Sequence, residues 1–193
     1  MNLLTKYQEV ILASESKTRK KILKTYGINF KTKKHNINEK KYINNDSPQK
    51  IVKTLAKRKA ESLKFFFPDS IIIGSDQILV FNKKILTKAK TKKEAFQNFL
   101  MLRGQEYRLL SSIYILNKGK FFWKTTKSAK LYMQFIKKKK ITDYINKHEK
   151  VISSILGSYK IEKDIMNCIE ILKGDIETIQ GFPIANFIKK IRE

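Results

Sequence analysis

The residues Ile71-Ile72-Ile73-Gly74-Ser75-Asp76-Gln77 indicate a strand at the centre of a β-sheet. The three isoleucines are β-branched, and such a continuous apolar run is typical of a strand that is buried on both faces. Pro68-Asp69-Ser70 precedes the run, and Gly74 follows it as a boundary. We therefore predict that the strand ends at Gly74. Ser75, Asp76 and Gln77 then lie beyond the sheet, where α/β proteins commonly place active-site groups.

The residues before this strand alternate between strand and helix patterns. Gly27 follows one helical stretch and suits a helix C-terminus, while Ser47-Pro48 has the N-cap serine and first-turn proline of a helix start. The expected elements are a strand at 9–13, a helix from Arg19 to Tyr26, a strand at 28–33, a polar loop at 34–46 and a helix that starts at Ser47-Pro48.

The alternation continues in the second half of the chain. Thr91-Lys92-Lys93-Glu94 has the spacing of a capping box. The expected elements are a helix from Thr91 through Leu102, strands at 106–116 and 120–134 joined by a turn at Asn117-Lys118-Gly119, and helices at 141–148 and 185–191. This order predicts an α/β fold in which helices cover a sheet.

The length of the chain predicts a single domain that spans residues 1–193. No apolar run approaches the roughly 18 residues that a membrane helix needs. Glu9 interrupts the apolar stretch nearest the N-terminus, so a signal peptide is not expected either. Cys168 is the only cysteine, which excludes an intrachain disulfide and a thiolate metal cluster. We expect a cytoplasmic protein with no membrane partner.

The net charge of +25, from 42 basic and 17 acidic residues, would ordinarily suggest a nucleic acid or another polyanion as partner. The basic residues are mostly lysine, however, and lysine, isoleucine and asparagine are abundant together, which suggests a compositional bias. Arginine is the preferred side chain for bidentate recognition of phosphates and bases. The arginines are only Arg19, Arg58, Arg103, Arg108 and Arg192. We therefore do not expect a dedicated nucleic-acid reader.

A hydroxyl-rich loop between the first expected strand and helix is a candidate phosphate site. It contains Ser14, Ser16 and Thr18, followed by Arg19. Backbone N–H groups at a helix start, hydroxyls and a guanidinium together can hold a polyphosphate. Serines before a helix are also ordinary caps, so this pattern alone leaves both interpretations open. The Walker and G-x-G-x-x-G phosphate-binding motifs are absent.

Two acidic residues are candidates for a metal site. Asp76 follows the central strand, and Glu39 lies in the polar loop of a chain that is poor in acids. Two carboxylates could hold Mg²⁺ or Mn²⁺, and Asp76 could also activate a water. Lys59 and Lys88 could neutralise phosphate charge. Each of these four residues could equally be an ordinary surface or turn residue.

Taken in order, the motifs resemble those of the Maf family of nucleotide pyrophosphatases from about Val10 to Arg192. The similar segments are Leu12-Ala13-Ser14-Glu15-Ser16-Lys17-Thr18-Arg19, Asn36-Ile37-Asn38-Glu39, Leu55-Ala56-Lys57-Arg58-Lys59-Ala60, Ile73-Gly74-Ser75-Asp76-Gln77, Ile85-Leu86-Thr87-Lys88-Ala89, Gly157-Ser158-Tyr159-Lys160-Ile161-Glu162, Gly174-Asp175 and Gly181-Phe182-Pro183. The order is more specific than any one motif.

The resemblance implies a fold and a set of roles. The fold is a mixed central sheet flanked by helices, of the Maf/ITPase-like type, with a cleft between two lobes and often a homodimer. The activity is cleavage of a nucleoside triphosphate between its α and β phosphates with a divalent metal. Asp76 would be the catalytic residue and, with Glu39, would hold the metal. The residues that would contact phosphates are Ser14, Ser16, Arg19, Lys59 and Lys88.

The resemblance also bears on the base of the substrate. Relatives with Gln after the catalytic Asp and Glu in the C-terminal motif are linked to 7-methyl-GTP, and those with Thr and Gln there to dTTP and UTP. Gln77 and Glu162 resemble the first group, and a carboxylate can accept from the N1–H and N2–H₂ edge of guanine. Thr18 matches neither group well. The departures from the family pattern are Lys17, Thr18, Ala89, Tyr107 and Gln134.

Three functions therefore stay open at this point. The first is a pyrophosphatase that prefers 7-methyl-GTP, and the second is a dTTP/UTP pyrophosphatase of the same family. The third is a basic, nucleic-acid-binding protein without catalysis. Steep loss of affinity with salt would indicate the third, whereas strict dependence on a metal would indicate either enzyme.

Overall fold

The structure is a computed structural model that describes residues 8–43, 46–86, 88–148 and 168–192. The chain divides into two compact units. Unit 1 comprises Met1–Gln77, Leu110–Lys127 and Asp175–Glu193, and unit 2 comprises Ile78–Leu109 and Ser128–Gly174. The single domain and the cleft expected from the sequence stay predictions.

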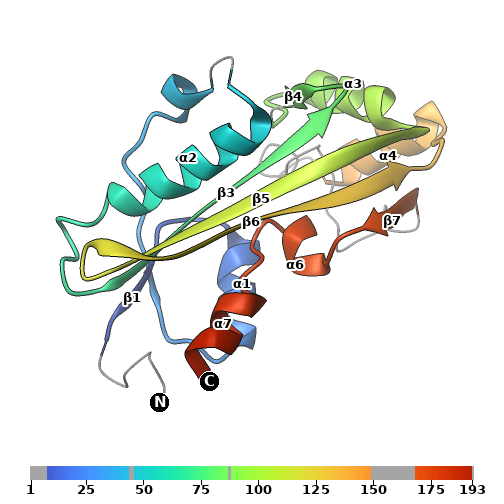
Figure 1. Cartoon of the computed structure of the whole chain (residues 1–193). Coiled ribbons are helices and arrows are strands. Elements are labelled where there is room, and N and C mark those ends of the chain that lie inside the picture. The colour runs from blue at the N-terminus through green and yellow to red at the C-terminus, as the bar shows by residue number, and fades with distance from the viewer. Residues whose placement is uncertain (1–7, 44–45, 87, 149–167, 193) are drawn as a thin grey trace. The chain divides into compact units, whose positions relative to one another are not determined.

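A seven-stranded sheet runs in the order β2-β1-β3-β5-β6-β7, and β4 pairs with β3 (Figure 1). The strands are β1 Val10–Leu12, β2 Lys31–Thr32, β3 Ile71–Phe81, β4 Lys84–Leu86, β5 Gln105–Asn117, β6 Lys120–Met133 and β7 Ile169–Lys173. β1 pairs in parallel with β2 and β3, whereas β4 and β7 pair antiparallel with β3 and β6. The predicted mixed sheet with flanking helices is confirmed.

Except for α6, the helices begin and end within a few residues of the predicted positions. They are α1 Lys17–Thr25, α2 Pro48–Glu61, α3 Lys92–Leu102, α4 Lys138–Lys147, α6 Ile176–Ile179 and α7 Ala185–Arg192, with a 3₁₀ turn η1 at Glu39–Tyr42. Ser47 caps α2 by accepting from the Lys50 N–H, and Thr91 caps α3 by accepting from the Glu94 N–H. Both caps were predicted from the sequence. Strands β4 and β7 and the short helix α6 were not.

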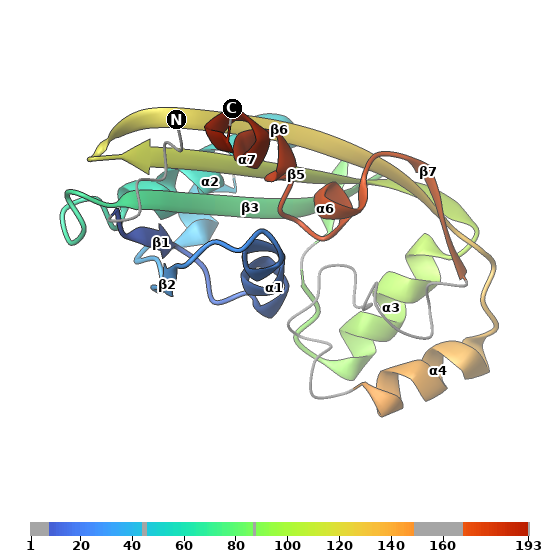
Figure 2. The same ribbon diagram turned by 90° about the horizontal axis from the view of Figure 1, so that it is seen from below.

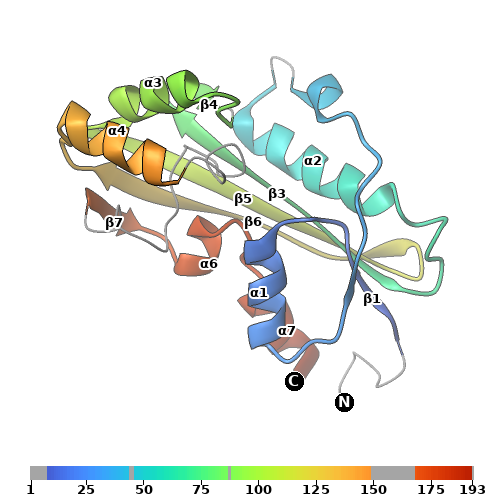
Figure 3. The same ribbon diagram turned by 180° about the vertical axis from the view of Figure 1, so that it is seen from behind.

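Opposite faces of the sheet in unit 1 pack against different helices. Val10, Leu12, Ile71 and Ile73 point to the face covered by α1 and α7, in a cluster that includes Leu23, Phe187 and Ile188. Ile11 and Ile72 point to the face covered by α2, with Ala60 and Leu63. Figures 2 and 3 show α1 and α7 on one side of β1 and β3 and α2 on the other. The alternation of a strand therefore decides which helices Ile71, Ile72 and Ile73 of β3 meet.

Candidate functional site

The predicted end of the central strand at Gly74 is wrong, because β3 continues through Gly74 to Phe81. Ser75, Asp76 and Gln77 are therefore part of the strand. Asp76 lies two residues after Gly74 and four after Ile72, so its side chain is on the same face of the strand as theirs, the face covered by α2. Ser75 and Gln77 belong to the opposite face. The strand separates side chains that the sequence places next to each other.

Gly74 allows α2 to lie unusually close to β3. A Cβ atom at this position would come within 2.2 Å of the Ala56 carbonyl oxygen and 2.6 Å of the Ala60 amide nitrogen. Real Cβ atoms essentially never approach other atoms this closely. The close contact brings Lys59, the neighbour of Ala60, to the side chain of Asp76.

Lys59 joins the two predicted acidic residues. Its Nζ lies 2.5 Å from Oδ1 of Asp76 and 2.9 Å from Oε1 of Glu39. Lys59 and Asp76 are each only 5% exposed, whereas Glu39, in η1, is partly exposed. A buried ammonium needs such partners, since an unpaired buried charge is very costly. The structure thus brings together three of the predicted site residues around one cation.

The two carboxylates have opposite pKa shifts. Burial raises the pKa of Asp76, although the charges of Lys59 and Arg19 oppose this effect. A hydrogen bond with His35 is the largest cause that lowers the pKa of Glu39 to about 2; burial opposes it, and the charge and hydrogen bond of Lys59 lower the pKa further. Glu39 is therefore the stable anion of the pair, and Asp76 is the carboxylate that accepts a proton more readily.

His35 is a member of this cluster that the sequence prediction missed. Its Nε2 lies 3.3 Å from Oε1 of Glu39, four residues further along the chain. Its Nδ1 is buried and has no hydrogen-bond partner among the described residues. The i, i+4 spacing from Glu39 was the available signal, but it is weak in a segment expected to be a loop.

The hydroxyl-rich loop packs beside the Lys59 cluster through Arg19. The Arg19 guanidinium donates from Nη1 to Ser14 Oγ at 3.2 Å and to the Ser75 carbonyl at 3.0 Å, and from Nε to the Gly181 carbonyl at 3.2 Å. Desolvation lowers the pKa of Arg19, and the charges of Asp76 and Glu39 partly restore it. Arg19 therefore connects three chain segments next to the two acids.

Ser16 has the ordinary role that its position allows. It is the N-cap of α1, and its Oγ accepts from the Arg19 N–H at 3.4 Å. Its own N–H donates to Ser14 Oγ at 3.2 Å, and Ser14 is buried. Thr18 lies in the first turn of α1 and is partly buried. A cap at this position does not exclude phosphate contact, because backbone N–H groups at a helix start still favour anions.

Gln77 lies on the face of β3 away from Asp76 and holds the segment that leads into α7. Its Nε2 donates to the carbonyls of Thr178 and Ile179 at 3.0 and 2.9 Å and to Ser111 Oγ at 3.1 Å. Ser111 also donates to the Thr178 carbonyl, at 2.7 Å. The Gln77 amide therefore contacts acceptors within the protein.

The remaining predicted residues lie elsewhere. Lys88 belongs to unit 2, where it lines a hollow of about 270 Å³ with residues at the start of α3. Glu162 lies outside the described residues.

Within the described ranges, no group of three or more histidine, cysteine or acidic side chains is placed to hold a metal ion. A search of the same ranges finds no helix with the length and apolar character to cross a membrane.

Comparison with known proteins identifies the family. A family model described as "Maf-like protein" matches residues 9–193. The "Nucleoside triphosphate pyrophosphatase" of Pelagibacter ubique is 31% identical, covering 96% of each chain. The "7-methyl-GTP pyrophosphatase" of Bartonella quintana is 31% identical, covering 95% of this chain and 94% of that one. The "dTTP/UTP pyrophosphatase" of a Geobacillus species is 29% identical, covering 96% of this chain and 97% of that one. The match of the family model over nearly the whole length shows that the chain belongs to the Maf family.

Proposed function

We propose that this protein hydrolyses nucleoside triphosphates between the α and β phosphates and releases a nucleoside monophosphate and pyrophosphate. The observation that best supports this function is the buried Asp76 carboxylate, bonded to Lys59 beside Glu39 and Arg19, in a member of the Maf family. The names of its relatives agree with this reaction.

In the proposed reaction, Asp76 is the general base. It takes a proton from a water whose oxygen bonds to a phosphorus of the α–β linkage, and the bond between that phosphorus and the bridging oxygen breaks, so that the monophosphate and pyrophosphate separate. Burial favours the protonated form of Asp76 and so assists this transfer. Lys59 holds the carboxylate in place, and its charge, with that of Arg19, stabilises the negative charge that develops on the phosphates. The phosphate contact that the family resemblance implies for Lys88, which belongs to unit 2, stays a prediction.

Asp76 and Glu39 fit a site for Mg²⁺ or Mn²⁺. Both metals prefer oxygen ligands, and Mg²⁺ is usually bound by one or two carboxylates together with substrate phosphates. Asp76 and Glu39, which both contact the Lys59 ammonium, match that pattern. When bound, the ion would supply further positive charge to the phosphate oxygens.

A nucleotide panel tests the proposed reaction. The full chain is incubated with each nucleoside triphosphate, with and without Mg²⁺ or Mn²⁺, and pyrophosphate and monophosphate are measured. We expect equal amounts of the two products and no activity without metal. Release of inorganic phosphate and a diphosphate would instead place cleavage at the β–γ linkage and contradict the proposal.

Replacing Glu39 with Gln is expected to weaken the use of metal. The amide keeps the size of the side chain and loses the charge that attracts a divalent ion. The metal concentration for half-maximal activity should rise about tenfold or more, and added metal should restore part of the rate. Glu106→Gln is the matched control, because Glu106 pairs with Lys130 in unit 2. An unchanged metal titration in the Glu39 variant would exclude Glu39 from the metal site.

For the base, we propose a preference for 7-methyl-GTP over dTTP and UTP. Relatives with either name have nearly the same identity, so the proposal depends on Thr18, Gln77 and Glu162. Glu162 would accept from the guanine edge, and Gln77 would act through the 178–179 segment that it holds.

The Gln77→Thr, Glu162→Gln double variant should narrow the preference for 7-methyl-GTP roughly tenfold to a hundredfold, as kcat/KM for the three nucleotides would show. A wild-type preference for dTTP would contradict the base assignment and leave the reaction itself untouched.

The proposed reaction also suggests where the protein works. Nucleoside triphosphates are cytoplasmic substrates, and the free thiol of Cys168 fits a reducing compartment. We therefore propose a cytoplasmic enzyme. The homodimer implied by the family resemblance stays a prediction, and measurement of the molar mass in solution would test it.

A further inference from the structure

Three phenylalanines are strongly exposed in unit 1. Phe65 is 84% exposed, Phe66 is 71% exposed, and Phe121 is 55% exposed. Phe65 and Phe66 lie in the loop between α2 and β3, and Phe121 lies at the start of β6. A single exposed apolar residue is normal, but a group of large ones with a polar rim marks a surface that contacts a partner.

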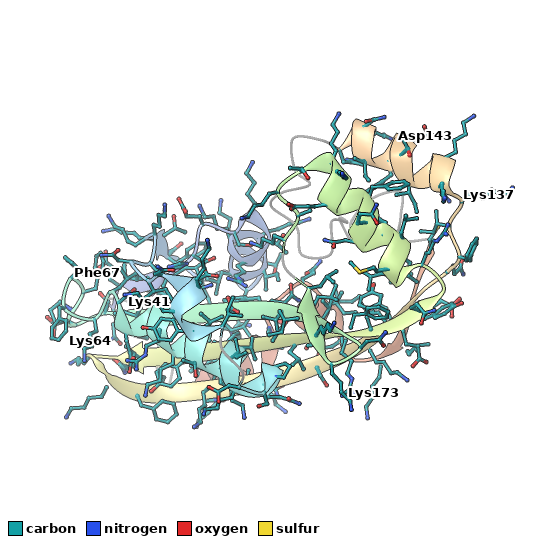
Figure 4. The ribbon with its side chains drawn as sticks, turned by 90° about the horizontal axis from the view of Figure 1, so that it is seen from above. Lys41, Lys64, Phe67, Lys137, Asp143 and Lys173 are labelled. Atoms are coloured by element: carbon teal, nitrogen blue, oxygen red, sulfur yellow. The ribbon has the colours of Figure 1, made fainter. Side chains whose placement is uncertain are left out.

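The two segments form one surface, which we call the aromatic tip and define as residues 64–68 and 117–121. The Lys118 N–H donates to the Ser70 carbonyl at 3.3 Å, and the Gln8 amide bonds to both Asp69 and Asn117. Figures 1 to 3 agree that the α2–β3 loop lies beside the β5–β6 turn, and Figure 4 shows Lys64 and Phe67 at this end. Because both segments are in unit 1, this surface needs nothing from unit 2.

The aromatic tip is anchored to the core by its less exposed members. The Phe121 ring packs on Tyr114, with 5.3 Å between ring centroids. Tyr114 and Phe67 both pack on the buried cluster that contains Ala60 and Leu63. The exposed Phe65 and Phe66 therefore adjoin residues that are packed on the core.

The charges around the aromatic tip are mostly positive. The Lys64, Lys33 and Lys124 ammonium groups lie over the rings of Phe65, Phe67 and Phe121, at 4.8, 5.8 and 5.6 Å from the ring centroids. Exposed Lys118 and Lys120 flank Gly119 in the β5–β6 turn. Acids near this end include Asp69, which is exposed, Glu9, which pairs with Lys31 at 2.5 Å, and Glu61, which pairs with Lys57 and Arg58. The partner of such a surface should be both apolar and negatively charged.

We propose that the aromatic tip docks on an anionic phospholipid bilayer. Phenylalanine side chains enter the boundary between headgroups and acyl chains, while neighbouring lysines attract the anionic headgroups. A second copy of the chain is a poorer partner, since two such tips would place lysines against lysines. Single-stranded nucleic acid is also a poorer fit, because the tip contains lysine and no arginine, and Lys64 already covers a face of the Phe65 ring. The surface thus predicts peripheral binding, contrary to the sequence-based expectation of no membrane partner.

Vesicle flotation with the full chain tests the proposal. One set of vesicles contains phosphatidylcholine alone, and the other contains two parts phosphatidylcholine to one part phosphatidylglycerol. The Phe65→Ser, Phe66→Ser double variant is compared with Met101→Ser, Phe135→Ser, which removes exposed apolar side chains from unit 2. Lys118→Glu, Lys120→Glu is compared with Lys138→Glu, Lys139→Glu, an equal charge change in α4. Circular dichroism shows that each variant is folded.

We expect the wild type to bind only the vesicles that contain phosphatidylglycerol, and less at raised salt. The phenylalanine variant should lose roughly tenfold or more of this binding, since apolar burial supplies part of the affinity. The Lys118→Glu, Lys120→Glu variant should lose more vesicle binding than the Lys138→Glu, Lys139→Glu control.

Four results would overturn the proposal. The first is that the wild type binds neither kind of vesicle, and the second is that each variant and its control lose vesicle binding equally. The third is binding of an oligonucleotide that depends on Phe65 and Phe66 while vesicle binding does not. The fourth is a dimer, seen in sedimentation, that depends on Phe65 and Phe66. Activity on nucleotides is measured separately, so failure of the membrane proposal and failure of the proposed reaction can be told apart.

Discussion

Replacing Asp76 with Asn is expected to reduce pyrophosphate release by roughly a hundredfold to ten-thousandfold, because the amide can neither accept the proton of the attacking water nor offer a charged ligand to a metal. The fold should be retained. Asn has the same size, and the buried Lys59 ammonium keeps Glu39 as a partner at 2.9 Å. The measurement is kcat with a saturating nucleotide and metal, beside circular dichroism and thermal unfolding of the same sample.

Asp69→Asn is the matched control for this change. Asp69 is exposed and lies before β3, so its substitution removes one negative charge from unit 1 without touching the cluster around Lys59. It should leave activity nearly unchanged. If the Asp76 variant retained near-normal turnover, the assignment of Asp76 as the general base would be wrong.

Replacing Gly74 with Ala is expected to destabilise the protein by about 3 kcal/mol or more, which is at the upper end of the effect of overpacking. The added Cβ would lie 2.2 Å from the Ala56 carbonyl oxygen and 2.6 Å from the Ala60 nitrogen, which are both backbone atoms of α2. Backbone atoms cannot move to another rotamer as a side chain can, so α2 would have to move away from β3. Urea unfolding measures the loss, and the same movement should reduce activity because it separates Lys59 from Asp76.

Two further variants separate this clash from other effects of losing a glycine. Gly119→Ala places a Cβ where no atom lies within 4 Å, and a positive φ of 70° is its main cost, about 1 kcal/mol. Adding Ala60→Gly to Gly74→Ala removes the contact of 2.9 Å with the Ala60 Cβ but leaves both backbone contacts. Stability should therefore return only in part. Full recovery would show that the side chain of Ala60, rather than the backbone of α2, requires glycine at 74.

The positions of most helices could be predicted because the signals for them are local. Ser47 and Thr91 cap their helices as their residue types suggest, since a side chain that accepts a backbone N–H acts within one turn. The long strands β5 and β6 and their turn at Lys118-Gly119 were predicted for the same reason. Strand β7 was missed because its exposed Ile171 and Leu172 give no alternating pattern, and its place depends on pairing with Leu131 and Tyr132 of β6.

The sequence by itself determined the family, the α/β class and the identity of the candidate residues, because each depends on residue types in a fixed order along the chain. Only the tertiary structure decided how these residues meet. Strand β3 continues past Gly74, since its later residues pair with β4, and this places Asp76 and Gln77 on opposite faces of the sheet. The close approach of α2 at Gly74 then brings Lys59 to Asp76, and η1 brings Glu39 to the same ammonium. These contacts join residues that are far apart in the sequence, and they arise from strand pairing and from the distance between a helix and a strand, neither of which a local pattern records.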